Sequence, residues 1–206
     1  MKKVVMFLLV TALAAGIWCS VAGSEETVEE PSTKKMFPTG VEFDHGGQTY
    51  KLSLTGVGVR KKVVFKVYAI AHYMEVAEFA DIYKAMDTAL GDSYAKQITM
   101  DFARDVGVDK IQDAYRKGFE KNATDEEMEV IAPFVDVFVG YFTEDAKEND
   151  QYVLRWLPDG IVLTVVKGEE RDPIENVTFA KVLWRIWLGE KSIVDPKKLV
   201  NMTVAE

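Results

Sequence analysis

The alternation of apolar and polar positions divides the chain into strand-like and helix-like segments. Short β-prone runs at 40–43 and 49–54 flank a turn-forming cluster at 44–47, which predicts a hairpin. The run from Lys62 to Met74 is rich in Val, Tyr, Ile and Ala, and we expect one long buried strand there. Two more strands, at 152–157 and 161–167, flank Pro-Asp-Gly and predict a second hairpin.

Apolar residues recur at spacings of three and four in other segments, and this periodicity predicts helices. These segments cover 79–91, 108–122, 124–142 and 178–188, and a β-prone run at 96–102 separates the first two. Thr124 stands three residues before Glu127, which is the spacing of a capping box at a helix start. Because strands and helices are grouped rather than alternating, the pattern predicts an α+β fold with a mainly antiparallel sheet.

The first 22 residues differ from the rest of the chain. Lys2 and Lys3 precede an apolar run from Val4 to Trp18, which is typical of a secretory signal peptide and short for a membrane span. We expect cleavage after Ala22, with Ser24 as the alternative boundary; an uncleaved N-terminal anchor is the competing interpretation. Residues 23–36 are rich in Glu, Ser and Thr and predict a flexible leader. The folded domain would then cover 37–206 and be exported to the periplasm.

Composition excludes several classes of function. The chain has 206 residues and a net charge of −8, and loss of Lys2 and Lys3 with the signal lowers that charge by 2, to −10. An acidic chain offers nucleic-acid phosphates little to bind. The one cysteine, Cys19, lies in the signal segment, so the mature chain would have no thiol for catalysis, disulfides or metal ligation. We expect a single domain with no nucleic-acid partner and no transmembrane span in the mature chain, as a monomer or weak homo-oligomer.

The sequence contains none of the common catalytic or metal-binding motifs. The sequence contains no nucleotide-binding glycine loop, no serine-hydrolase elbow and no HExxH pair. Its two histidines, His45 and His72, are far apart, and His72 falls in the predicted long strand, where we expect a hydrogen-bonded core residue. We therefore expect no cofactor and no metal site.

One segment carries candidate chemistry. Gly56 and Gly58 interrupt a strand pattern just before Arg60, which indicates a bulge or a close backbone approach by a ligand. Arg60 would project from the end of an apolar sheet, where a guanidinium suits a carboxylate or enolate oxygen, and Tyr68 would add a hydroxyl donor. The alternative is an arginine on a solvated hairpin that pairs with a surface acid.

Four segments together resemble the chalcone isomerase-like family, more its exported bacterial branch than the plant enzymes. They are Gly-Val-Gly-Val-Arg at 56–60, Tyr-Ala-Ile-Ala-His-Tyr-Met at 68–74, Asp-Phe-Ala-Arg-Asp-Val at 101–106 and Phe-Ala-Lys-Val-Leu-Trp-Arg-Ile-Trp-Leu-Gly-Glu-Lys-Ser at 179–192. The resemblance covers about 37–200. It implies an open-faced β-sandwich, a large antiparallel sheet with helices packed on one face.

The resemblance also implies roles for single residues. In the plant enzymes that cyclise chalcones, an Arg at the position of Arg60 stabilises the phenolate or developing enolate, assisted by a Thr, a Tyr and an Asn. Tyr68 stands where those enzymes carry the Thr, Asp109 near their Tyr and Arg116 near their Asn, with Tyr115 as the substitute if the register shifts. Only the Arg matches, and an acidic Asp109 in the pocket would repel a phenolate.

We therefore expect a non-catalytic protein that binds a small apolar anion such as a fatty acid. The fatty-acid-binding branch of the family implies that Arg60 and Tyr68 hold the carboxylate, and Asp109, Tyr115 and Arg116 are further candidates for the site. Aromatic and aliphatic residues of two helices would line the cavity or simply fill the core: Phe134, Val135, Phe138, Phe142, Trp184 and Trp187. The alternatives are a chalcone isomerase-type intramolecular lyase that uses Arg60, and an envelope interaction protein without a ligand.

Overall fold

The computed structural model describes residues 26–204, so the predicted signal peptide and its cleavage position lie outside the described residues. An antiparallel sheet of eight strands forms the scaffold, in the order β10-β8-β7-β6-β5-β4-β3, with β9 also paired to β8. Its strands are β3 (Gly40–His45), β4 (Gln48–Lys62), β5 (Phe65–Met74), β6 (Lys96–Phe102), β7 (Gln151–Leu157), β8 (Ile161–Val166), β9 (Glu169–Glu170) and β10 (Ile174–Glu175).

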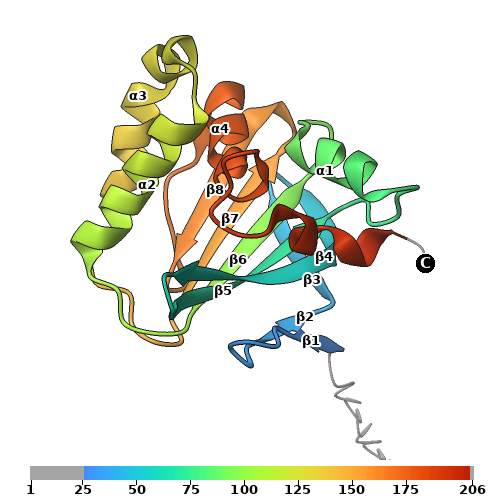
Figure 1. Ribbon diagram of the computed structural model, residues 1–206. Helices are drawn as coiled ribbons and strands as arrows, with labels where there is room; N and C mark the ends of the chain where they lie inside the picture. The colour runs from blue at the N-terminus through green and yellow to red at the C-terminus, as the bar shows by residue number, and fades with distance from the viewer. Residues whose placement is uncertain (1–25, 205–206) are drawn as a thin grey trace, which may run out of the picture.

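Helices pack on one face of this sheet, as Figure 1 shows. The described helices are α1 (Ile82–Leu90), α2 (Val108–Asn122), α3 (Asp125–Gly140) and α4 (Val177–Leu188), and short 3-10 turns are η1 (Pro158–Gly160), η2 (Pro196–Leu199) and η3 (Asn201–Thr203). The predicted α+β class and open-faced sandwich are confirmed. No helix within residues 26–204 is long and apolar enough to cross a membrane.

Several predicted elements coincide with the observed ones. Strand β6 and helix α2 have the predicted bounds. Helix α3 begins at the predicted capping box: the Thr124 hydroxyl accepts from the Glu127 amide at 3.2 Å, and the Glu127 carboxylate accepts from the Thr124 amide at 3.0 Å. These agreements come from local patterns that need no tertiary information.

Two expectations about the N-terminal half differ from the structure. The run expected as one strand from Lys62 is divided by a turn at Val63 and Val64, and β5 begins only at Phe65. Within the expected flexible leader, β1 (Thr27–Glu29) pairs with β2 (Met36–Pro38) as a separate two-stranded sheet. Its turn is held by Glu30, whose buried carboxylate accepts from the amides of residues 32 and 33.

The sheet is curled, so that its two faces enclose two separate cores. In β5 the even residues Tyr68, Ile70 and Met74 join the core under the helices, whereas Ala69 and Ala71 face the other core. That second core lies inside the curl: the Phe43 ring of β3 is 4.1 Å from the Arg155 guanidinium of β7, although three strands separate them in the sheet order. Small alanines on this face leave room for β3 to fold across it.

The C-terminal segment lies against β4 at the two glycines that the sequence singled out. A Cβ on Gly56 would fall 2.1 Å from the Lys198 carbonyl oxygen, and the β4–β5 register shifts between Leu54 and Gly56. The register shift agrees with the expected bulge, whereas the backbone that approaches Gly56 closely is the chain's own η2, where a ligand was the expected neighbour. Thr55 Oγ1, next to Gly56, donates to the Leu199 carbonyl at 2.7 Å.

His72 is part of the same contact between β4 and the C-terminal segment. It is fully buried, and its Nδ1 lies 2.7 Å from the Thr55 hydroxyl. Burial, with a smaller contribution from the Lys96 charge, lowers the pKa of His72 to about 3. The expectation of a hydrogen-bonded core histidine therefore agrees with the structure.

We predict that Gly56→Ala destabilises the protein by about 1–3 kcal/mol or more, because the added methyl group forces η2 off the sheet. Gly58→Ala is the matched control, since its Cβ would meet only side chains, Leu199 at 3.3 Å and Ile70 at 3.6 Å. Urea unfolding of both variants measures the difference. Equal losses of stability would contradict the proposed packing.

We also predict that His72 makes the fold sensitive to acid. The unfolded histidine takes up a proton near pH 6.5, whereas the folded one resists until about pH 3, so stability falls as the pH drops through this window. The slope from this residue is about 1.4 kcal/mol per pH unit. The free energy of unfolding of His72→Gln, measured at several pH values between 3 and 7, should lack this component; parallel curves for the two proteins would refute it.

Candidate functional site

Arg60 and Tyr68 form the polar end of the helix-covered face. They are cross-strand partners in the β4–β5 ladder, which places both side chains on one face of the sheet. Arg60 is half-buried, and its Nη1 donates to two backbone carbonyls, Ile193 at 2.8 Å and Lys61 at 3.0 Å. Within residues 26–204 it forms no ion pair with an acid. The alternative of an arginine paired with a surface acid is therefore not what the structure shows.

The Tyr68 hydroxyl is buried beside this guanidinium. It accepts a hydrogen bond from Trp187 Nε1 of α4 at 2.9 Å, and no group of residues 26–204 accepts its own proton. Burial raises the pKa of Tyr68 to about 12, although the Trp187 bond and the Arg60 charge act in the opposite direction. At neutral pH the hydroxyl is therefore protonated and has a donor to give.

Ile193 belongs to the loop between α4 and η2 that covers Arg60. Its amide donates to the Ile186 carbonyl at 3.0 Å, so the last turn of α4 fixes the loop. The Ile193 carbonyl is a neutral amide acceptor. A carboxylate carries a negative charge and would therefore be a stronger acceptor for the Arg60 guanidinium.

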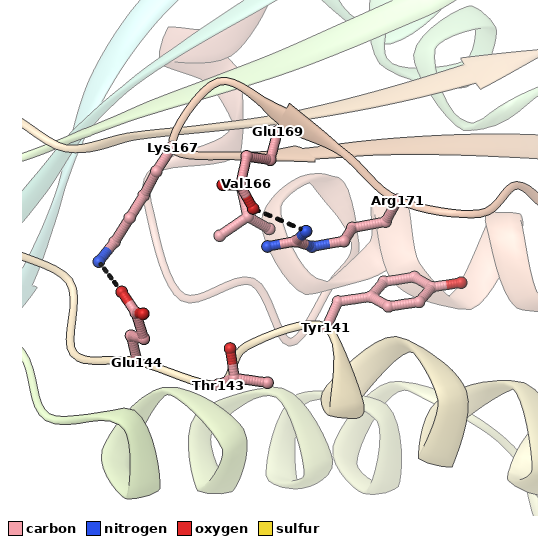
Figure 2. Close-up of a pocket in the computed structure, with 7 residues that line it drawn as sticks. All are labelled: Tyr141, Thr143, Glu144, Val166, Lys167, Glu169 and Arg171. Atoms are coloured by element: carbon pink, nitrogen blue, oxygen red, sulfur yellow. Dashed lines mark hydrogen bonds and ion pairs between the residues drawn. The ribbon is translucent and has the colours of Figure 1, made fainter.

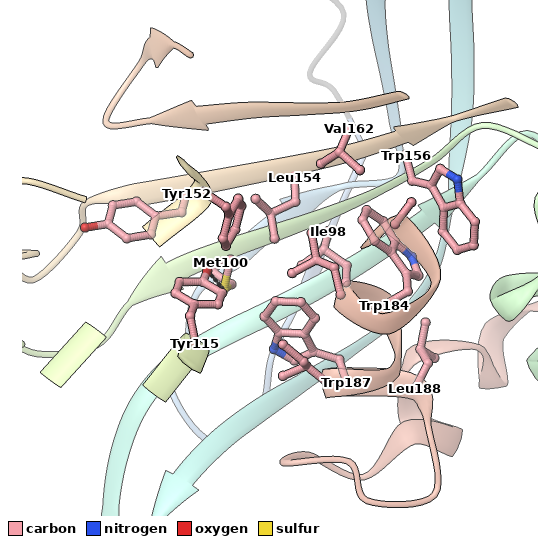
Figure 3. Close-up of a cluster of buried hydrophobic side chains, with 14 of the residues drawn as sticks. Ile98, Met100, Tyr115, Tyr152, Leu154, Trp156, Val162, Trp184, Trp187 and Leu188 are labelled. Carbon is pink, nitrogen blue, oxygen red and sulfur yellow. Dashed lines mark hydrogen bonds between the residues drawn. The ribbon is translucent and has the colours of Figure 1, made fainter. Parts of the chain in front are cut away.

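Tyr68 and five further aromatic side chains form a closed ring of contacts, which we call the aromatic cage. Its members, each in contact with the next, are Tyr68, Phe102, Tyr152, Phe142, Tyr115 and Trp187. Figure 3 shows Tyr115 beside Met100, and the Tyr115 hydroxyl lies 3.9 Å from the Met100 sulfur. Side chains fill this interior, and Met100 is its most adaptable member.

The structure brings some of the expected site residues together and leaves others outside. Tyr115 is buried in the cage, where burial and the neighbouring Tyr68 and Tyr152 raise its pKa well above the usual value. Asp109 and Arg116 lie on the exposed side of α2, and Arg116 pairs with Asp136 at 2.6 Å. The helical periodicity explains the division, because one face of α2 cannot hold residues 109, 115 and 116 together.

Residues expected to line a cavity or fill the core do the latter. Val135, Phe138, Phe142, Trp184 and Trp187 are buried, and Phe134 packs at the edge of the same core. A small pocket of about 80 Å³ lies elsewhere, between the end of α3 and the β8–β9 turn (Figure 2). Its cations are paired, Lys167 with Glu144 at 3.4 Å and Arg171 with Glu169 at 3.0 Å, so it offers no free charge to a ligand.

Sequence reasoning missed several parts of this site. Met100, Phe102 and Tyr152 were not singled out, although their alternation in two strands places them on the helix-covered face. The Ile193 carbonyl carries no side-chain signal at all. Among residues 26–204 no group of three or more His, Cys, Asp or Glu side chains is placed to hold a metal ion.

We predict that Tyr68→Phe and Tyr115→Phe differ in stability. Tyr68→Phe leaves the buried Trp187 N–H without an acceptor and should cost about 1–3 kcal/mol. Tyr115→Phe removes only a long contact to sulfur and should cost less than about 1 kcal/mol. Thermal unfolding of the two variants checks this order; a reversed order would show that the Tyr68–Trp187 bond does not form.

Comparison with known proteins agrees with this fold. Residues 37–199 match the model of the family described as chalcone isomerase-like. No curated protein matches the chain. A solved structure, the fatty-acid binding protein of Arabidopsis thaliana, is similar with a TM-score of 0.66 and 17% sequence identity, covering 86% of this chain and 98% of that one. The match over most of its length shows that the chain belongs to the chalcone isomerase-like family.

Proposed function

We propose that this protein is an exported, periplasmic, non-catalytic member of its family that binds a small carboxylate with an apolar tail, such as a fatty acid. The observation that carries the proposal is the Arg60–Tyr68 pair. Among residues 26–204 Arg60 has no acidic partner, and it lies beside a buried hydroxyl whose proton is free to be donated. Export rests on Lys2, Lys3 and the apolar run that follows them.

The chemistry of the pair suits a carboxylate. The Arg60 guanidinium offers a planar fork of donors that matches the two oxygens of a carboxylate. A carboxylate oxygen would take the position of the Ile193 carbonyl on Nη1, and the second oxygen would accept from Tyr68. Because Trp187 occupies the tyrosine oxygen as a donor, the hydroxyl proton is directed away from Trp187.

The tail would enter between the sheet and the helices. The aromatic cage provides an apolar wall for it, and Met100, which contacts Tyr115, has to shift, which an unbranched thioether side chain does at low cost. The similarity to the fatty-acid binding protein supports this assignment, since that protein has the same fold along nearly its whole length.

A second candidate is an interaction protein without a ligand. It is favoured by the filled cage, because side chains of the protein itself occupy the space beside Tyr68. The lyase alternative has less support: Asp109 and Arg116, which stand near the helical residues of the enzymes, face outward, and of the α2 candidates Tyr115 alone faces the core.

We predict that native mass spectrometry of the protein incubated with decanoate detects a one-to-one complex. Arg60→Ala should weaken it by about 10- to 100-fold, as expected for loss of a charged hydrogen bond. Arg116→Ala is the matched control and should retain the ligand, because Arg116 pairs with Asp136 at the surface. Tyr68→Phe should weaken binding about 5- to 20-fold.

Two results would count against the proposal. If neither the native protein nor Arg60→Ala holds an acid, the interaction role replaces ligand binding. If both hold it equally, the carboxylate sits elsewhere. Decay of chalcone absorbance that depends on Arg60 would instead establish the lyase.

A further inference from the structure

The tip of the β4–β5 hairpin exposes three consecutive apolar side chains. Val63 is 88% exposed, Val64 78% and Phe65 59%. The other exposed large apolar residues of 26–204 stand singly in the sequence. Isolated apolar residues on a surface are ordinary, whereas a contiguous group indicates a contact surface.

The backbone of this tip is unfavourable for the residues it carries. Val63 has φ 57, in the left-handed region, where a β-branched side chain is strained. The other described non-glycine residues with positive φ, Lys34, Asn149, Asp159 and Lys167, are unbranched at Cβ, and glycines hold both positive φ values of the β3–β4 turn. The folding of the hairpin therefore does not explain valine at position 63.

Cations surround this apolar tip. Lys61, Lys62, Lys66 and Arg104 are all exposed, and none forms an ion pair with a carboxylate in the described part of the chain. The Arg104 guanidinium lies 5.1 Å from the centre of the Phe65 ring, so the apolar and basic groups form one surface. This concentration of positive charge occurs in a chain whose net charge is −8.

We propose that this surface, Val63–Phe65 with Lys61, Lys62, Lys66 and Arg104, docks on an anionic lipid bilayer. Apolar side chains ringed by cations match the two layers of such a membrane: the valines and the phenylalanine enter the boundary of the acyl chains, and the cations contact lipid phosphates. A protein partner would satisfy the apolar group. The cations, which have no carboxylate partner among residues 26–204, favour a surface that is negatively charged throughout, although Lys66 also donates to the Ser32 carbonyl.

The position of the tip adds a second argument. Arg60 is three residues from Val63 along β4, or about 10 Å at about 3.3 Å per residue. Figure 1 shows the hairpin reaching the edge of the molecule beside the loop that leads into α2. Docking would thus bring the Arg60–Tyr68 pair close to the lipid headgroups. The docking itself does not depend on the proposed function.

A fluorophore at the tip tests the proposal in the full chain. Val64→Cys, in a Cys19→Ser background, is labelled with an environment-sensitive nitrobenzoxadiazole dye and mixed with vesicles of equal parts phosphatidylglycerol and phosphatidylcholine. We expect a blue shift and quenching by brominated lipids. The same dye on Val130→Cys, which is 53% exposed on α3, is the matched control and should not respond. Because the readout is local, membrane contact by the N-terminal apolar run does not imitate it.

Charge and backbone variants sharpen the test. Reversal of Lys61, Lys62 and Lys66 to Glu should weaken the response at least about tenfold, whereas reversal of Lys84, Lys117 and Lys121 should leave it nearly unchanged. Val63→Gly should raise the midpoint of thermal unfolding, because the strain is removed, and yet weaken vesicle binding.

Three outcomes would overturn the proposal: no response at position 64, an equal response at position 130, or a response that grows with protein concentration in the absence of vesicles, which would indicate contact between two copies. Since decanoate binding is measured without vesicles, failure here leaves the proposed ligand untouched, and loss of ligand binding leaves this result untouched.

Discussion

The register of β4 against β5 positions the Arg60–Tyr68 pair, the contact at Gly56 and the exposed apolar turn. This ladder pairs Arg60 with Tyr68 and Gly56 with His72, and ends in the turn at Val63 and Val64. A shift by one residue would turn Arg60 and Tyr68 to opposite faces and expose the buried side chains of β5. The irregularity between Leu54 and Gly56 lets the first half of β4 follow the curl while its second half keeps the alignment on which the site depends.

The C-terminal segment packs against β4 on the helix-covered face of the sheet. Leu199 accepts from Thr55, and the Ile193 carbonyl accepts from Arg60, so one short stretch after α4 contacts both ends of the second half of β4. This arrangement explains why the two glycines precede the arginine. Gly56 and Gly58 have no side chain where the C-terminal segment packs on β4, and Arg60 supplies a hydrogen-bond donor where that segment leaves the strand. It also makes the Ile193 loop the part that must yield when a carboxylate approaches Arg60.

Much of this fold could be predicted from local pattern, and the failures have specific causes. The helix α2 and the strand β6 follow from periodicity, and α3 follows from a capping box. The turn at Val63 was not predicted because no Gly, Asn or Pro marks it. The β1–β2 hairpin was not predicted because its polar residues are held by tertiary contacts, such as that of Lys35 with Asp101 at 2.5 Å. Arg60, Tyr68 and Tyr115 lie on the helix-covered face of the sheet or point toward it, whereas Asp109 and Arg116, which the family resemblance implied, lie on the exposed face of α2. The aromatic cage joins residues from five strands and helices and from the loop after α3, and such a set cannot be read from any one of these segments.

The central claim is that Arg60 and Tyr68 together receive a carboxylate. The most direct measurement follows the side-chain Nε–H resonance of Arg60 in an isotope-labelled protein during a titration with decanoate, with Arg116 as the internal reference. The account predicts a saturable shift of the Arg60 resonance while that of Arg116 stays in place. An Arg60 resonance that does not move, or one that moves in parallel with Arg116, would contradict it.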